Sequence, residues 1–177
     1  LDPVAQRVAH GSAEILSQAT HWTSLDAALA DIDFSIATTA RSRAKFRYYA
    51  TPQQVQGVLE EKQSWIGSAA MVFGREDSGL TNEELAQVDL LTGIPMAADY
   101  PSLNLGQAVM VYCYQLSALR QVSAQTEVGS EADHLAALRQ RARNLLQRLE
   151  VAGDEKLANW LQQRMGLLQQ RDIAMLH

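Results

Sequence analysis

A loop with two glycines follows an apolar segment near the middle of the 177-residue chain. The apolar segment Ala69–Phe73 leads directly into the loop Gly74–Leu80, which holds Arg75, Glu76 and Gly79. Two glycines in such a loop allow the backbone to come close to a ligand. The Gly-Lys-Ser/Thr ending of a phosphate-binding P-loop is absent here. A tight turn before a helix cap explains the same residues, so both interpretations stay open for this segment alone.

A second pair of polar residues marks the start of a predicted long helix. Ser102 and Asn104 precede an apolar stretch whose spacing predicts a helix from Ser102 to about Gln121. A helix N-terminus presents free N–H groups and the positive end of the helix dipole, so it can bind an anion or orient a polar ligand. Plain N-capping by Ser or Asn is the alternative. Cys113 lies at an apolar position of this helix and is predicted to pack in the core.

Short apolar segments predict the strands that must bring these residues together. Three of them predict buried strands, over residues 34–39, 69–73 and 90–95. A helix from Pro52 to about Gln63 separates the first two. Strands that alternate with helices predict an α/β fold with a mainly parallel sheet flanked by helices. Ligands bind beyond the carboxyl ends of the strands in such sheets, which places the loops after the three strands in one region.

The C-terminal part of the chain has a different pattern. Residues 123–130 are polar and are predicted to form a linker, and two amphipathic patterns separated by Gly153-Asp154 predict a helical hairpin. We therefore predict one domain over residues 1–122 and a helical extension over residues 130–177. The first of these helices has leucines that should pack and arginines that either form a solvated face or contact RNA; they are Leu135, Leu138, Leu145, Leu149, Arg139, Arg141, Arg143 and Arg148.

Composition excludes several classes of protein. The single cysteine rules out a disulfide framework within one chain, and the four histidines share no metal-ligand spacing, so we expect no metal site. No apolar run is long enough to span a membrane, and we expect a cytoplasmic protein. The net charge of −5 argues mildly against nucleic acid, but Arg41, Arg43, Lys45 and Arg47 form a local basic run.

Taken together, the two loop segments are similar to a known pair of motifs. VFGREDSGLTNEEL, followed after a short gap by IPM and then YPSLNLGQAVMVYCYQL, resembles motifs 2 and 3 of the SpoU/TrmH family of RNA methyltransferases. The segment Thr38–Arg43 is similar to the strand-end loop of the TrmJ-like/LasT branch of that family. The resemblance covers roughly residues 1–120 and, in the LasT group, also the helical tail.

The resemblance implies a trefoil-knotted SPOUT-type methyltransferase fold, a homodimer, and S-adenosylmethionine as cofactor. It implies cofactor contacts on the strand-end loops and the helix start; they are Thr38, Thr39, Ala40, Gly74, Glu76, Ile94, Pro101, Ser102 and Leu103. An apolar slot with backbone polar groups nearby suits the adenine of this cofactor.

The reaction implied by the resemblance is methyl transfer to a ribose 2′-hydroxyl of tRNA or rRNA. Ser102, Asn104 and Arg75 are the expected catalytic residues, and Arg43 and Arg75 are expected to bind RNA. The Arg and Asn of the family's motif 1 would lie upstream of Leu1, so the chain is expected to be a fragment. Two other functions stay open: a non-catalytic RNA-binding or assembly factor with the same fold, and an unrelated nucleotide-binding α/β module.

Overall fold

The computed structural model describes residues 3–9, 11–40, 49–96, 103–121, 131–151, 153–169, 171–172 and 175. The chain forms two compact units, Leu1–Ala30 and Asp31–His177. The first unit contains three short helices, α1 (Pro3–Val8), α2 (Ala13–Gln18) and α3 (Leu25–Leu29). Ser24 caps α3, because its hydroxyl accepts a hydrogen bond from the Ala27 N–H.

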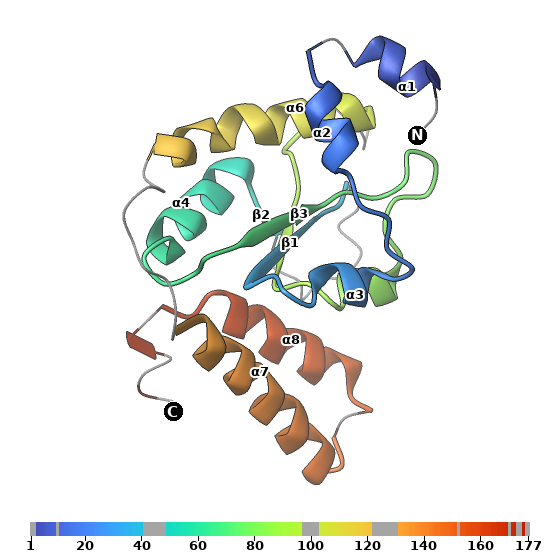
Figure 1. The fold of residues 1–177 in the computed structure, drawn as a ribbon. Coiled ribbons are helices and arrows are strands. Elements are labelled where there is room, and N and C mark those ends of the chain that lie inside the picture. The colour runs from blue at the N-terminus through green and yellow to red at the C-terminus, as the bar shows by residue number, and fades with distance from the viewer. Residues whose placement is uncertain are drawn as a thin grey trace. The chain divides into compact units, whose positions relative to one another are not determined.

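The second unit is built on a four-stranded sheet with the order β2-β4-β1-β3 (Figure 1). The strands are β1 (Phe34–Thr38), β2 (Tyr49–Ala50), β3 (Ala69–Val72) and β4 (Leu90–Thr92). All three strand pairs are parallel, which confirms the predicted α/β fold with a mainly parallel sheet. The two-residue strand β2 was not predicted, since two residues are too few to show a periodic pattern. The trefoil knot stays a prediction.

Helices α4 (Pro52–Lys62), α5 (Asn82–Leu85) and α6 (Leu105–Leu116) follow strands β2, β3 and β4. Capping boxes begin α4 and α5, where Thr51 and Thr81 exchange hydrogen bonds with Gln54 and Glu84. The helix predicted from Ser102 is shorter than expected: it begins at Leu105, and η1 (Ser117–Gln121) continues it as a 3₁₀ helix. Asn104 caps it, and Ser102 lies outside the described residues.

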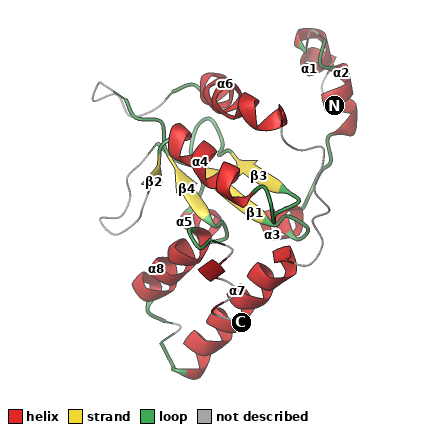
Figure 2. Cartoon of the chain, turned by 90° about the vertical axis from the view of Figure 1, so that its left-hand side faces the viewer, coloured by secondary structure: helices red, strands yellow, loops and turns green. Residues whose placement is uncertain are grey.

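The C-terminal residues form two helices, α7 (Glu131–Arg148) and α8 (Glu155–Gly166), which we call the C-terminal hairpin. Both ribbon views place α4 and α6 on one side of the sheet and the C-terminal hairpin on the other (Figures 1 and 2). Gly166 at the end of α8 lies against the backbone carbonyl of Asp89, so closely that a Cβ atom would overlap it. The hairpin is therefore packed directly on the segment that leads into β4.

A buried cluster at the sheet forms the core, and α4 contributes to it. Its members are fully or nearly fully buried, and they include Phe34, Ile36, Val55, Leu59, Trp65 and Leu90. Leu138, Leu167 and Leu168 from the C-terminal segment pack against the same cluster. Burial of apolar area on this scale is the main force that holds sheet, helices and hairpin together.

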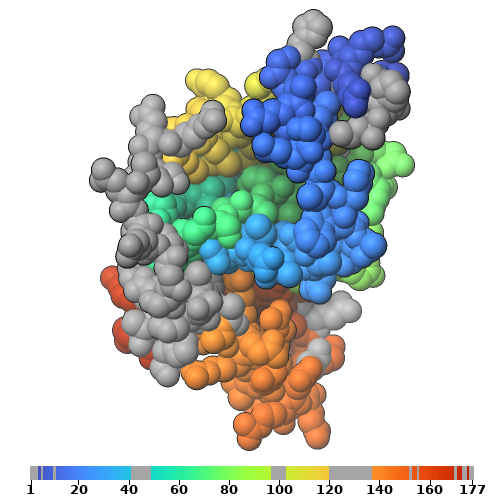
Figure 3. All heavy atoms as spheres, viewed as in Figure 1, coloured from blue at the N-terminus to red at the C-terminus, as the bar shows by residue number. Residues whose placement is uncertain are grey.

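Three apolar residues predicted to pack are exposed instead. Cys113 lies on the outer face of α6, three residues from Met110, whose side chain is 68% exposed. Because α6 is apolar almost all round, its spacing could not identify the face that meets the sheet. Leu145 and Leu149 are exposed near the end of α7, beyond the part of the helix that packs on the core. Figure 3 shows one face of the C-terminal hairpin, in orange.

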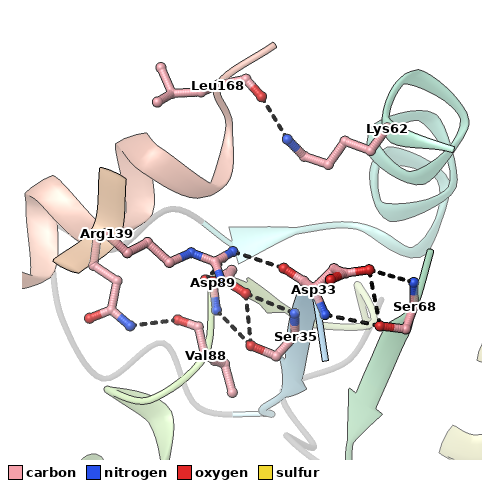
Figure 4. Close-up of polar contacts among 9 residues, drawn as sticks. Asp33, Ser35, Lys62, Ser68, Val88, Asp89, Arg139 and Leu168 are labelled. Carbon is pink, nitrogen blue, oxygen red and sulfur yellow. Dashed lines mark hydrogen bonds and ion pairs between the residues drawn. The ribbon is translucent and has the colours of Figure 1, made fainter. Parts of the chain in front are cut away.

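Arg139, predicted to lie on a solvated face or to contact RNA, is largely buried and paired with Asp89 (Figure 4). Its guanidinium also donates to the backbone carbonyl of Asp33 at 3.1 Å. Arg141, Arg143 and Arg148 are exposed, as expected for a solvated face. The basic run therefore has two separate parts: one arginine holds the hairpin to the sheet, and three face outward.

Candidate functional site

A cavity lies at the carboxyl ends of β1, β3 and β4, where the sequence predicted that the strand-end loops meet. Its wall consists of residues from these loops and from the first turns of α6; they are Thr38, Thr39, Ala40, Phe73, Gly74, Arg75, Glu76, Asp77, Ser78, Gly79, Leu80, Gly93, Ile94, Met96, Leu103, Leu105, Ala108 and Tyr112. Apolar side chains and backbone from several loops thus surround one space, as in small-molecule sites of α/β proteins.

The loop after β3 closes on itself through its two glycines. A Cβ atom on Gly74 would lie 2.5 Å from the carbonyl carbon of Gly79, so no larger residue fits at this position. The Gly79 N–H donates to the carbonyl of Arg75 at 2.9 Å, and Gly79 has a φ of +71°. This left-handed conformation favours glycine. The glycines therefore shape the loop itself, and the loop then forms one wall of the cavity.

Glu76 joins this loop to the start of α6. One carboxylate oxygen accepts a hydrogen bond from the Leu105 N–H at 2.8 Å, and the other accepts from the Asn104 side-chain amide at 3.2 Å. The Asn104 side chain in turn accepts from the Gly106 N–H at 2.9 Å. A carboxylate is favoured at this place, because a helix N-terminus carries free donors and partial positive charge. Glu76 and Asn104 thus cap the helix together.

Arg75 forms a two-point ion pair with Glu84 on the outer side of the same loop. Its terminal nitrogens lie 3.3 and 3.1 Å from the two carboxylate oxygens. This pairing raises the pKa of Arg75 and, together with a hydrogen bond from the Thr81 N–H, lowers the pKa of Glu84. The Arg75 side chain is nevertheless 61% exposed, so its cationic group stays accessible at the rim of the cavity.

The loops after β1 and β4 meet on the other wall. The Thr39 N–H donates to the carbonyl of Thr92 at 2.9 Å, and a Cβ atom on Gly93 would lie 3.0 Å from the Thr39 carbonyl oxygen. Thr38 uses its hydroxyl to bond the carbonyl of Val72 on β3 at 3.2 Å. These contacts hold the ends of β1, β3 and β4 at the fixed spacing that the cavity requires.

Most residues proposed from the sequence line this one cavity. Thr38, Thr39, Ala40, Gly74, Arg75, Glu76, Ile94 and Leu103 all do so, and Asn104 lies at its edge through Glu76. Pro101, Ser102 and Arg43 lie outside the described residues. The other wall residues were not proposed as site residues from the sequence, and Phe73, Gly93 and Tyr112 are among them. Phe73 lies within the first motif and Gly93 directly precedes the IPM segment, whereas nothing in the spacing set Tyr112 apart from other apolar helix positions.

Neither a metal centre nor a membrane span is found in the described part of the chain. No group of three or more His, Cys, Asp and Glu side chains among these residues is arranged to hold a metal ion. No helix in the described ranges is both long enough and apolar enough to cross a membrane.

Comparison with known proteins adds to this geometry. The SpoU rRNA Methylase family matches residues 1–114, and the C-terminal domain of the tRNA/rRNA methyltransferase LasT matches residues 132–177. The uncharacterized tRNA/rRNA methyltransferase LasT of Escherichia coli (strain K12) is 60% identical over the whole chain, which covers 78% of that protein. The tRNA (cytidine-2'-O-)-methyltransferase TrmJ of Methanocaldococcus jannaschii is 41% identical over 58% of this chain and 45% of its own length.

A solved structure supports the same assignment at the level of the fold. The crystal structure of TrmJ from Z. mobilis ZM4 matches 99% of this chain and 78% of its own, with a TM-score of 0.67 and 24% identity. The family match covers more than half of the chain, and the likeness to LasT covers all of it. The chain therefore belongs to the SpoU rRNA Methylase family.

Proposed function

We propose that this protein transfers a methyl group from S-adenosylmethionine to a ribose 2′-hydroxyl of tRNA or rRNA. The observation that carries the proposal is the bond between Glu76 and the Asn104-Leu105 helix start, at the edge of a cavity lined by three strand-end loops. This bond joins the two sequence motifs that resemble the family's methyltransferase motifs. TrmJ of Methanocaldococcus jannaschii, a relative, is named as a tRNA (cytidine-2'-O-)-methyltransferase.

The residues around the cavity fit S-adenosylmethionine by their chemistry. Leu80, Ile94, Leu105 and Ala108 offer an apolar surface for an adenine ring. Hydroxyls and backbone groups border this surface, and the residues proposed to hold the cofactor are Thr38, Thr39, Ala40, Gly74, Glu76, Ile94, Pro101, Ser102 and Leu103. When bound, the cofactor supplies a sulfonium methyl group that an oxygen nucleophile can attack.

The protein's own contribution is to orient groups around that methyl. The Asn104 side chain donates to Glu76 and accepts from the Gly106 N–H. These two hydrogen bonds hold it in one orientation at the start of α6. Fixed geometry of this kind lowers the entropic cost of bringing the reactants together. Ser102, Asn104 and Arg75 are proposed to act near the reacting hydroxyl, with Ser102 placed there by the family motif alone.

Arg75 and Arg43 are proposed to bind the RNA. The Arg75 guanidinium is exposed at the rim and keeps its charge at every pH at which RNA is stable. Arginine binds phosphate oxygens with paired N–H groups, and such contacts give affinity without base specificity. The net charge of −5 is compatible with RNA binding, because the charged groups nearest a cleft have the largest effect on the electrostatic potential there.

We also propose that the protein acts as a homodimer in the cytoplasm. Met110 and Tyr114 on the outer face of α6 are 68% and 80% exposed, which is unusual for large side chains on one helix face. A second copy would cover them. Light scattering coupled to size-exclusion chromatography should give twice the monomer mass, and a Tyr114→Glu variant should shift the mass toward the monomer.

Binding of S-adenosylmethionine and transfer of labelled methyl test the proposal. Isothermal titration should show saturable binding of S-adenosylmethionine, with no comparable binding of ATP. Incubation with radiolabelled cofactor and unmodified tRNA or rRNA should then give label that survives as a 2′-O-methylated nucleoside. A protein that does not bind S-adenosylmethionine contradicts the proposal. RNA binding together with cofactor binding, but without transfer, would favour a non-catalytic RNA-binding factor.

A further inference from the structure

Tyr112 is a buried aromatic residue at the inner end of the cavity. It lies in α6, eight residues beyond the cap residue Asn104, and its side chain is 2% exposed. Its neighbours on the outer side of the helix, Met110 and Tyr114, face away from the sheet and are exposed. Tyr112 therefore marks the side of α6 that faces the cavity and the sheet.

The hydroxyl of Tyr112 joins a short chain of buried hydrogen bonds. Thr92 at the end of β4 donates its one hydroxyl proton to the carbonyl of Ala50 on β2, at 2.8 Å. The Tyr112 and Thr92 hydroxyl oxygens lie 2.9 Å apart. Because the Thr92 proton is already used, Tyr112 is the donor in this second bond. Burial raises the pKa of Tyr112, which keeps that proton in place. The Thr92 hydroxyl on β4 thus bonds both to Tyr112 on α6 and to Ala50 on β2.

The ring of Tyr112 makes a further contact on the opposite wall. It meets Phe73 edge to face, with ring centroids 5.8 Å apart and planes at 72°. This arrangement is favourable for aromatic pairs. Phe73 directly precedes Gly74, whose loop carries Glu76 back to the start of α6. Tyr112 and Glu76 therefore hold α6 at two places, one at the inner end of the cavity and one at its rim.

We propose that Tyr112 is a positioning residue for S-adenosylmethionine, which sets the distance between α6 and the ends of β3 and β4 through its bond to Thr92 and its contact with Phe73. This inference rests on the proposed function, since it takes S-adenosylmethionine as the ligand of the cavity. It predicts that loss of one hydroxyl, which removes no apolar surface, weakens cofactor binding. The binding of RNA should not depend on Tyr112.

The test uses variants that break or keep the one bond. Tyr112→Phe removes only the donor of this bond. Thr92→Val removes its acceptor together with the separate bond to the Ala50 carbonyl, whereas Thr92→Ser keeps a hydroxyl for both bonds. Isothermal titration of the whole chain should show that Tyr112→Phe and Thr92→Val each raise the dissociation constant for S-adenosylmethionine about tenfold, the effect of one buried hydrogen bond. Thr92→Ser should restore near wild-type binding, and the double variant should bind no more weakly than either single variant. With active protein, the KM for cofactor should rise while the KM for RNA stays constant.

A matched control separates positioning from general stability. Ser35→Ala also removes buried hydrogen bonding, because the Ser35 hydroxyl donates to the Asp89 carboxylate and accepts from the Asp89 N–H, but it does so at the opposite end of β1 from the cavity. Its melting temperature should fall at least as much as that of Tyr112→Phe, while cofactor binding stays at the wild-type level. Equal weakening in Ser35→Ala, or wild-type binding by Tyr112→Phe, overturns the inference and leaves the proposed function standing. If the wild-type chain itself fails to bind S-adenosylmethionine, the proposed function fails, and the inference fails with it.

Discussion

Arg139 and Asp89 form an ion pair of 2.8 Å between the C-terminal hairpin and the amino-terminal end of β4, the end of the sheet opposite the cavity. The other carboxylate oxygen of Asp89 accepts from the Ser35 N–H at 2.8 Å and from its hydroxyl at 2.9 Å (Figure 4). Gln162 of α8 adds a bond to the carbonyl of Val88 at 2.9 Å. One carboxylate thus ties the hairpin and the central strand β1 together.

Replacing Arg139 with leucine should destabilise the protein by about 3 kcal/mol. The change leaves the Asp89 carboxylate buried without its cationic partner, and an unpaired buried charge costs more than the pair itself contributes. The free energy of unfolding from urea titration measures the effect. Arg148→Leu, at an exposed position of the same helix, should change it by less than about 0.5 kcal/mol. Equal stability of the two variants would show that the ion pair does not hold the hairpin.

Lys62 should give the stability of the protein an unusual dependence on alkaline pH. Its ammonium is buried over the rings of Phe34 and Trp65 and donates to the carbonyl of Leu168 at 2.6 Å. Burial lowers the pKa of Lys62 from 10.5 to about 8. A folded-state pKa below that of the unfolded chain means that the unfolded state holds the proton more tightly, so stability rises as the pH increases from about 8 to 10.5.

The variant Lys62→Met isolates this effect. Subtracting its free energy of unfolding from that of the wild type, across the range from about pH 7 to about pH 10.5, removes the contribution of other titrating groups. The wild type should gain about 3 kcal/mol relative to the variant over this range. A difference that stays flat with pH, or that falls as the pH rises, would contradict the buried position of the Lys62 ammonium.

The sequence predicts the local elements of this protein better than its long-range polar contacts. Apolar segments identify β1, β3 and β4 to within three residues, and the helix predicted from Pro52 to about Gln63 is present as α4. Such features depend on neighbours within a few positions. The partner of Arg139 is Asp89, fifty positions earlier, and no periodicity in α7 distinguishes this arginine from the exposed Arg143.

In the candidate site, too, the sequence predicts some residues and misses a long-range polar contact. The motif resemblance assigns Gly74, Glu76 and Asn104 to one site, because the family pattern carries long-range information that spacing lacks. Spacing marks Tyr112 only as an apolar helix position, although its hydroxyl bonds to Thr92 at the inner end of the cavity. A tyrosine and a phenylalanine satisfy the same periodic pattern, so only the tertiary structure reveals the role of the hydroxyl.

Replacing Glu76 with glutamine should weaken both the start of α6 and the cofactor site. The amide is neutral and has one acceptor oxygen, so it cannot accept from both Leu105 and Asn104 as the carboxylate does. We expect a loss of about 1–2 kcal/mol in the free energy of unfolding and about tenfold weaker binding of S-adenosylmethionine, measured by isothermal titration. Glu83→Gln, on the exposed side of α5, is the control and should change neither quantity. Unchanged binding by the Glu76 variant would remove this residue from the site.

Alanine at Gly74 and at Gly57 should have opposite effects on stability. At Gly74 the added Cβ would lie 2.5 Å from the Gly79 carbonyl carbon, so the loop must open and the wall of the cavity must move. At Gly57, inside α4, nothing lies within 4 Å of an added Cβ, and alanine favours a helix more than glycine does. Thermal unfolding should show Gly57→Ala more stable than wild type by about 0.5–1 kcal/mol, with unchanged cofactor binding. Gly74→Ala should melt at a lower temperature and bind S-adenosylmethionine more weakly, and wild-type binding by this variant would mean that the closed loop is not part of the cofactor site.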